Sequence, residues 1–267
     1  MQPIRLRPSE RVVEADWLAP RLAPFGSGVS SVVPGGFDAY SRILHPARGK
    51  NDEAIRWADV AIKSGGIMHR LVQFHAINRS SLSGTEVEAP EAGNLPSDLL
   101  RVLCLNLAEH TSTPDSCWFC LWDGHGWIRE TGISTVEFRD SGPLTLESRT
   151  LHSTTDSVSL SSMLSSAVLS PTRVQLPNRN YLLFEGPLEA ATEVGWIMPG
   201  GTFVPQSPNL FWPSDHVWCV ASEIDLFCTL VAGSNALATE LAGDPRLEVL
   251  QVLADDSISA DSDKQNS

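Results

Sequence analysis

Apolar residues recur at helical spacing in three stretches of the chain. In the clearest stretch, apolar side chains repeat every three or four residues after Ser97: Leu99, Leu100, Val102, Leu103 and Leu107. Ser97 is a typical N-cap residue, so we expect a helix that begins there and ends near His110. Two shorter helices are predicted over 51–64, where Gly65 follows, and over 235–241.

Short apolar runs bounded by turn residues predict strands. Runs of this kind lie around Val12 and over 117–122, 173–176, 181–184 and 247–253. A nearly continuous apolar run over 217–230 predicts a central strand that is buried on both faces. Asp123-Gly124-His125-Gly126 predicts a tight turn, and the apolar Trp127 after it predicts the start of a return strand.

The order of these elements predicts the fold class. Helical and strand patterns do not alternate strictly along the chain, which favours an α+β fold over a parallel α/β fold. We expect a single domain over 1–254, with a mostly antiparallel sheet and a few packed helices. The stretch 140–172 is dominated by Ser and Thr, which indicates a flexible insertion. The polar, acidic stretch 255–267 predicts a disordered tail.

The net charge of the chain makes some classes of binding partner less favourable than others. The 267 residues carry a net charge of −13, and residues 180–267 hold 13 acidic but only two basic side chains. Such a field repels nucleic acid phosphates and anionic lipids, so we expect neither nucleic acid nor a membrane as a partner. It attracts a basic protein surface, although the simpler interpretation of the charge is solubility. The oligomeric state stays open.

Cysteine count and hydropathy predict a cytoplasmic location. No apolar run approaches the roughly 20 residues that span a bilayer, and no apolar stretch follows the first basic residues as in a signal peptide. The five cysteines are an odd number, which favours reduced thiols in a cytosol.

Sequence motifs give little support to several enzyme classes. The chain lacks a G-x-x-x-x-G-K-[ST] phosphate loop, a G-x-G-x-x-G motif, an H-E-x-x-H motif and a G-x-S-x-G elbow. Cys117 and Cys120 form a C-x-x-C pair, but on a strand their sulfurs would point to opposite faces of the sheet. We therefore expect small core side chains there, no metal and no cofactor.

Two aromatic segments are the main candidates for a site. Each places an Asp and a His close together, beside tryptophans. The candidate residues are Trp122, Asp123, His125 and Trp127 in the first segment, and Trp212, Asp215 and His216 in the second. Tryptophan beside polar groups is typical of protein hot spots and of stacking ligand sites. In the structural interpretation, each buried Trp ends a strand and each Asp caps a turn.

Two carboxylates add to this set. Glu223 and Asp225 stand two residues apart in the predicted central strand, so they would share a face about 7 Å apart. Paired carboxylates bind divalent cations or act as acid and base. The apolar Ile224 and Leu226 around them equally suit a half-buried strand that emerges into water.

Five stretches resemble a family of uncharacterised proteins from high-GC bacteria. They are FDAYSRILHPAR at 37–48, TPDSCWFCLW at 113–122, RNYLLFEGP at 179–187, SPNLFWP at 207–213 and WCVASEID at 218–225. The resemblance covers most of residues 37–250. It implies neither an activity nor catalytic residues, because none is assigned to that family.

Three hypotheses of function remain. The preferred one is a non-enzymatic, cytoplasmic protein-binding protein, similar to immunity or regulatory proteins, which uses an acidic, tryptophan-rich surface to hold a basic partner. The alternative is a small-molecule hydrolase whose Asp, His and Glu side chains meet between the two tryptophan-flanked turns. In a third hypothesis, the aromatic segments belong to the core of an assembly subunit.

Overall fold

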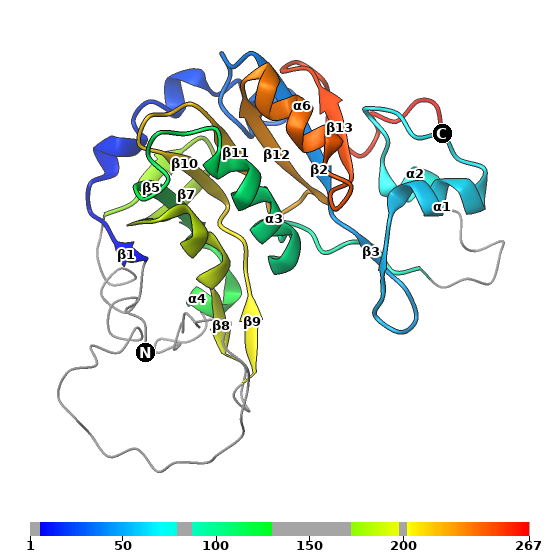
Figure 1. The fold of residues 1–267 in the computed structure, drawn as a ribbon, viewed down its shortest axis with the longest axis horizontal. Coiled ribbons are helices and arrows are strands. Elements are labelled where there is room, and N and C mark those ends of the chain that lie inside the picture. The colour runs from blue at the N-terminus through cyan, green and yellow to red at the C-terminus, as the bar shows by residue number, and fades with distance from the viewer. Residues whose placement is uncertain (1–5, 79–86, 130–171, 198–201, 267) are drawn as a thin grey trace, which may run out of the picture.

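An antiparallel sheet forms the centre of the computed structural model, which describes residues 6–78, 87–129, 172–197 and 202–266 (Figure 1). Its strands are β1 (Arg7–Pro8), β2 (Ala39–Leu44), β5 (Cys117–Trp122), β6 (Val174–Leu176), β7 (Arg179–Gly186), β10 (Leu210–Pro213), β11 (Cys219–Ala221), β12 (Cys228–Gly233) and β13 (Val249–Val252). They follow the spatial order β1-β7-β5-β10-β11-β12-β2-β13, and β6 also pairs with β7. This arrangement confirms the predicted α+β class with an antiparallel sheet.

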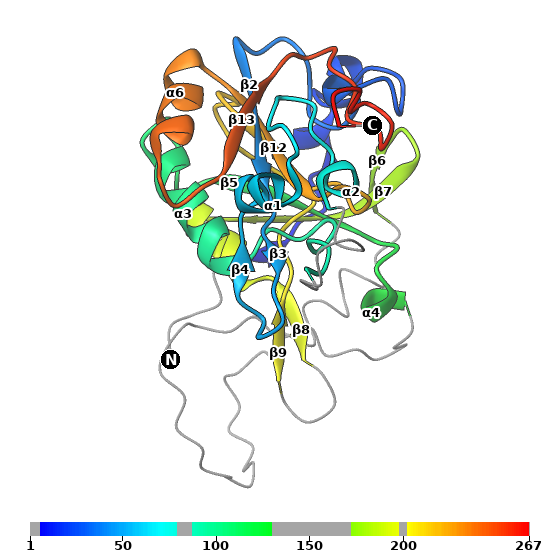
Figure 2. The same cartoon turned by 90° about the vertical axis from the view of Figure 1, so that its right-hand side faces the viewer.

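Helices and two small hairpins surround the sheet. The α-helices are α1 (Trp57–Ser64), α2 (Phe74–Ile77), α3 (Ser97–Ala108), α4 (Gly126–Arg129) and α6 (Asn235–Gly243). The 3₁₀ helices are η1 (Val12–Ala15), η2 (Ala19–Arg21), η3 (Val29–Ser31) and η5 (Leu188–Glu193). The hairpins pair β3 (Ala47–Arg48) with β4 (Ala54–Ile55), and β8 (Gly195–Ile197) with β9 (Phe203–Pro205). Helices α1 and α2 and the β3–β4 hairpin lie together at one side of the molecule (Figures 1 and 2).

Both faces of the sheet are buried. Along β5, Phe119 packs into one core and Trp118 into the other, because side chains alternate along a strand. Helices α3, η5 and α6 cover the first face (Figure 1). The N-terminal 3₁₀ helices and the pair α1 and α2 contribute the second core. The fold is therefore three layers deep, and nearly every residue of β5, β10, β11 and β12 is buried.

The three predicted helices are present. α3 begins at Ser97, although the N-cap position belongs to Pro96, which provides no side-chain cap. α1 begins at Trp57, later than the pattern predicts, because the Glu248 carboxylate accepts the N–H groups of Trp57 and Ala58, each at 2.8 Å. It ends at Gly65 as expected, with a φ of 72°.

The prediction of one long strand over 217–230 is wrong. The chain forms two antiparallel strands there, β11 and β12, and reverses between them. Asn209, which lies outside the turn, stabilises this reversal through two hydrogen bonds. Ser222 donates its N–H to the Asn209 carbonyl at 2.8 Å, and the Ser222 carbonyl accepts from the Asn209 side-chain amide at 3.2 Å. Glu223 and Asp225 consequently lie in a connecting turn and not on a strand.

The prediction of a hairpin after β5 is also wrong. Residues 126–129 form the short helix α4 in place of a return strand. The two edges of β5 are already paired with β7 and β10, so no position next to β5 is left for a third strand. Around Val12, the predicted strand is replaced by the 3₁₀ helix η1.

The two segments predicted to be flexible differ in outcome. The insertion at 140–172 lies outside the described residues except for Thr172. The stretch 255–266, predicted as a disordered tail, instead packs on the body, with Asp256, Ile258, Asp263 and Asn266 buried. The side chains of Ser262, Asp263 and Asn266 form hydrogen bonds to the loop between α1 and α2, which the composition of the segment alone does not reveal. No helix in the described part of the chain is long and apolar enough to cross a membrane.

Two glycines with similar backbone angles test how tightly the turn after β11 is packed. Gly93 has a φ of 67°, and a Cβ there would lie 2.5 Å from the Cα of Ile224. Gly65 has a φ of 72°, but a Cβ there would meet nothing within 4 Å. We expect Gly65→Ala to lower the free energy of unfolding by about 1–2 kcal/mol, the cost of a left-handed L-residue.

Gly93→Ala should lower the free energy of unfolding clearly more than Gly65→Ala, because the backbone of Ile224 must also move. Urea unfolding of both variants, followed by circular dichroism, measures this difference. Equal losses would show that the turn yields easily and that Gly93 is not a packing constraint.

Candidate functional site

The predicted site residues fall into two groups at opposite ends of β5. Pro213 in β10 pairs with Cys117, so Asp215 and His216 follow at the end where β5 begins. Asp123 and His125 come after Trp122, at the end where β5 finishes. A six-residue strand is roughly 17 Å long, so the two histidine-bearing turns do not meet.

The second aromatic segment has a structural role. Trp212 is fully buried in the second core, so its side chain is not part of the surface. One oxygen of the Asp215 carboxylate accepts the Thr111 hydroxyl at 2.8 Å, the Ser112 N–H at 2.8 Å and the Ser112 hydroxyl at 2.9 Å. Partial burial disfavours the charge of Asp215, but these bonds outweigh it and lower the pKa of the carboxyl. Asp215 therefore stabilises the turn that follows α3 by hydrogen bonding to Thr111 and Ser112.

His216 completes this structural group. Its ring stacks on Trp17, with 4.6 Å between ring centroids and 20° between planes. Trp17 in turn meets Trp212 edge to face at 6.0 Å. Burial lowers the pKa of His216, an effect that Glu14 and Asp215 only partly offset. The stack joins the N-terminal layer to the sheet and presents no catalytic arrangement.

The first aromatic segment and the two carboxylates converge on one arginine. Arg179, at the start of β7, lies 2.8 Å from Glu223 and 3.1 Å from Asp225 through its Nη2 atom. Its guanidinium also lies over the ring of Trp122, 5.4 Å from the centroid. Side chains about 100 positions apart in the sequence are thus brought together, although the strand on which the carboxylates were predicted does not exist.

The group is called the aromatic–acidic cluster below. It comprises Trp122, Asp123, His125, Trp127, Arg173, Arg179, Trp196, Asn209, Glu223 and Asp225. Within it, Asp123 pairs with Arg173 at 3.5 Å. The side chain of Asp225 is 74% exposed, whereas that of Glu223 is only 13% exposed. Asp225 is therefore the carboxylate with the greatest access to a partner.

Asn209 fixes the orientation of His125. The Oδ1 atom of Asn209 accepts the backbone N–H of Trp122 at 2.8 Å, which identifies that atom as the oxygen. The Nε2 atom of His125 lies 3.1 Å from the same oxygen and must therefore donate. In the neutral imidazole this leaves Nδ1 as an acceptor, and the described residues provide no donor to it. Burial lowers the pKa of His125, and the bond to Asn209 only partly offsets that effect.

A stack of rings extends from this histidine. His125 lies parallel to Trp127 at 5.6 Å, and Trp127 lies parallel to Trp196 at 5.4 Å. Trp122 meets His125 edge to face at 5.4 Å. All four rings are only partly buried. The cluster thus offers flat aromatic surface, one neutral acceptor and a largely exposed carboxylate on neighbouring elements.

Four members of the cluster were not predicted from the sequence: Arg173, Arg179, Trp196 and Asn209. Trp196 has no Asp or His beside it, and Asn209 stands in an ordinary Pro-Asn turn context, so neither gives a local signal. Arg179 does give one, because it is an isolated cation at the edge of a strongly acidic stretch. An isolated cation in such a setting is a good candidate for an internal ion pair.

A buried chain of two hydroxyls and one imidazole lies in the sheet, with no local sequence signal. The Nε2 atom of His45 lies 2.9 Å from the Thr229 hydroxyl, which lies 2.7 Å from the Ser222 hydroxyl. Burial lowers the pKa of His45 to about 4. All three residues are at most 1% exposed, so no substrate reaches them, and the chain joins the residues that directly follow β2 and β11 to Thr229 in β12.

The cysteines provide neither a metal site nor a reactive thiol in the described structure. All five are free and buried. Cys117 and Cys120 pack into different cores, as the alternation of a strand predicts, and burial raises the pKa of Cys117 to about 12. Among the described residues, no group of three or more His, Cys, Asp and Glu side chains could hold a metal ion.

Two clefts lie away from the predicted residues. One, of about 350 Å³, is bordered by the β3–β4 hairpin, the start of α3 and the loop before β13. It contains both arginine and carboxylate side chains, and Arg48 is paired there with Asp52 at 2.7 Å. The other, of about 340 Å³, lies between α3 and η5 and includes Leu105, which is 58% exposed.

The low pKa of His125 predicts a pH-dependent contribution to stability. The neutral form is favoured in the folded state, so the stabilisation is complete above the unfolded pKa near 6.5 and is lost as the pH falls towards the folded pKa. We expect the stability of the natural protein, relative to a His125→Phe variant, to be constant above about pH 7 and to decrease below it.

Chemical unfolding of both proteins at several pH values measures this difference. Nitrogen NMR of the imidazole should independently show the proton on Nε2. A constant difference in stability across the acidic range would contradict the lowering of the His125 pKa by burial, and a proton on Nδ1 would contradict the hydrogen bond to Asn209.

Comparisons of the chain with protein-family models, with curated proteins and with solved structures found no match. The resemblance to uncharacterised proteins of high-GC bacteria therefore stays a sequence-based expectation. The geometry of the aromatic–acidic cluster is the basis for the function that follows.

Proposed function

We propose that the protein is a non-enzymatic binding protein and that the aromatic–acidic cluster holds a basic segment of a protein partner. The observation that carries this proposal is the convergence of the first tryptophan segment with Glu223 and Asp225 around Arg179. Aromatic rings, a neutral acceptor and carboxylates are the groups that bind a guanidinium or an ammonium.

Arg179 illustrates the chemistry that the cluster accepts. Its guanidinium lies over two aromatic rings, those of Trp122 and Phe25, and is held by two carboxylates. A basic side chain of a partner would approach the exposed side of Asp225 and the faces of the tryptophan stack. The Nδ1 atom of His125 would accept one of its N–H groups. The site would thus repeat, between two chains, the contacts that Arg179 makes within one.

The charge of the whole chain supports the same partner. A net charge of −13 accelerates the encounter with a basic protein and slows the approach of nucleic acid. Reduced, buried thiols suit the cytoplasmic location that we propose for the protein.

The hydrolase alternative has less support. It requires His125 and His216 to face one cleft, whereas they follow opposite ends of β5. Asp215 would have to act as acid or base, yet one carboxylate oxygen accepts from Thr111 and Ser112 and the other accepts the N–H of Val217 at 3.4 Å. The cluster around Arg179 therefore supports binding better than acid–base catalysis.

Charge reversal at one exposed carboxylate tests the proposed surface. A partner captured from the native lysate would first be purified, and its affinity measured by titration calorimetry for the natural protein and for Asp225→Lys. We expect Asp225→Lys to weaken binding by about tenfold or more, because the added cation faces the basic segment directly.

The matched control is Glu109→Lys, which makes the same charge change on an exposed residue at the far end of α3. A lysine suits the C-terminal end of a helix, so this variant should keep its fold. It should alter the affinity by about twofold or less at moderate salt, where long-range fields are screened. Equal losses in both variants would mean that only net charge matters. Loss of binding in Leu105→Asp, with Asp225→Lys unaffected, would move the partner to the cleft between α3 and η5.

A further inference from the structure

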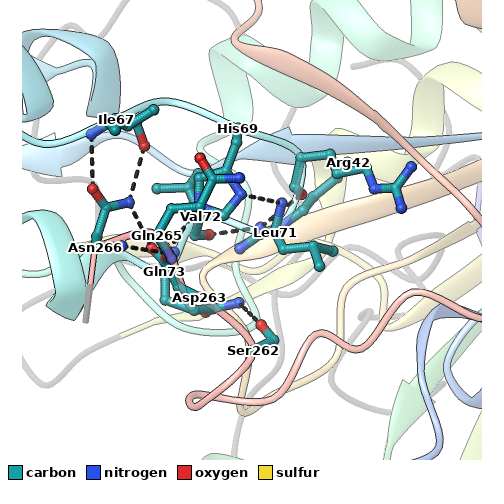
Figure 3. Close-up of polar contacts among 11 residues, drawn as sticks. Arg42, Ile67, His69, Leu71, Val72, Gln73, Ser262, Asp263, Gln265 and Asn266 are labelled. Atoms are coloured by element: carbon teal, nitrogen blue, oxygen red, sulfur yellow. Dashed lines mark hydrogen bonds and ion pairs between the residues drawn. The ribbon is translucent and has the colours of Figure 1, made fainter.

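The loop between α1 and α2 holds the segment 255–266 through specific polar contacts (Figure 3). The key residue of the segment is Asp263, whose side chain is 1% exposed. Its carboxylate accepts from the Nε2 atom of His69 at 2.8 Å and from the backbone N–H of Gln73 at 3.1 Å. Within the segment, it also accepts the side-chain amide of Asn266 at 2.8 Å.

Asn266 is the second contact point. Its Oδ1 atom accepts the N–H of Ile67 at 2.7 Å, and its Nδ2 atom donates to the carbonyl of Ile67 at 2.9 Å. The side chain therefore pairs with the backbone as a neighbouring strand would. Space there is limited, because a Cβ on Gly66 would lie 3.4 Å from the Asn266 oxygen and 2.9 Å from Ile77.

The loop is held from its other side by contacts that do not involve the segment. Arg42 of β2 is 2% exposed and donates to the carbonyl of Val72 at 2.8 Å. His69 accepts the N–H of Leu71 through Nδ1 at 3.3 Å. Its Nε2 therefore carries the hydrogen and donates the hydrogen bond to the Asp263 carboxylate. The donors that meet the carboxylate are thus positioned by the body of the protein (Figure 3).

The spacing of Asp263 and Asn266 matches this set of donors and acceptors. A carboxylate is required opposite two donors, and an amide is required opposite Ile67, which offers one donor and one acceptor. Burial disfavours the charge of Asp263, but the hydrogen bonds outweigh it and lower the pKa of the carboxyl. Few apolar contacts accompany these bonds; Ile258 is the buried apolar side chain of the segment.

We propose that residues 66–73 form a recognition site for an Asp-x-x-Asn peptide segment, which residues 255–266 of the same chain occupy. The ligand class is an acidic peptide with an aspartate and an asparagine three positions apart, in a turn in which the aspartate carboxylate also accepts the N–H groups of Gln265 and Asn266.

Ile258 belongs to the second core and the Asp256 carbonyl accepts the Val29 N–H at 3.0 Å, so these two residues anchor the start of the segment. The contacts of residues 262–266 are polar and the loop is held independently, so this end of the segment can leave while the anchored start stays in place. The site shares no residue with the aromatic–acidic cluster, so a test of one site does not depend on the outcome at the other.

The test uses the full chain and a fluorescent peptide with the sequence of residues 255–266. In the natural protein the intramolecular segment competes at high effective concentration, so the peptide should bind weakly. In the double variant Asp263→Ala and Asn266→Ala, the intramolecular segment no longer fits. We expect this variant to bind the peptide at least tenfold more tightly than the natural protein, as measured by fluorescence polarisation.

A control peptide that carries the same two alanine substitutions should not bind either protein. Absence of peptide binding by a double variant whose circular dichroism is native would overturn the proposal. Equal binding by the natural protein and the variant would overturn it as well, because the segment would then not occupy the site.

Hydrogen exchange of the natural protein keeps the proposal testable if the double variant does not fold. The amides of Ile67 and Gln73, which donate to the segment, should exchange through local opening and faster than those of α3. If they exchange only with global unfolding, the segment is an integral part of the core and the proposed recognition site is wrong.

Discussion

Burial of both faces of the central sheet is the constraint on which the rest of the structure depends. A strand such as β5, with Phe119 in one core and Trp118 in the other, has no face left for function. Polar groups that could meet a partner are therefore confined to the ends of strands and to the connections. The aromatic–acidic cluster lies at such a place, where β5 ends at Trp122 and β7 begins at Arg179.

The same constraint explains which parts of the fold could be predicted from the sequence. α3 shows a clear helical period because only one of its faces meets the sheet, and β5 and β13 appear as short apolar runs. Strands buried on both faces are apolar at almost every position, so a chain reversal inside such a run leaves little trace. β11 and β12 therefore appear as one strand, and the turn that separates them depends on Asn209, which precedes β10.

The candidate site could be predicted in part, and for a similar reason. Both aromatic segments contain tryptophan, aspartate and histidine, and only tertiary packing decides which of these side chains reach the surface. Trp212 faces the core because it pairs with Trp118 across two adjacent strands, whereas Trp122 lies at a strand end. The roles of Arg179 and Trp196 depend on contacts with residues far along the chain, which no local pattern encodes.

Side-chain oxygens that bind backbone N–H groups connect these observations. Much of the described chain is irregular, and irregular backbone needs hydrogen-bond partners when it is buried. Asn209, Asp215, Glu248, Asp263 and Asn266 provide them, each by accepting at least one backbone N–H group from a distant segment. Part of the acidic charge is therefore internal structure and not surface available to a partner. This is why mean polarity misleads for residues 255–266, which are polar but ordered, and why Asp225, with most of its side chain exposed, is the more informative carboxylate for binding.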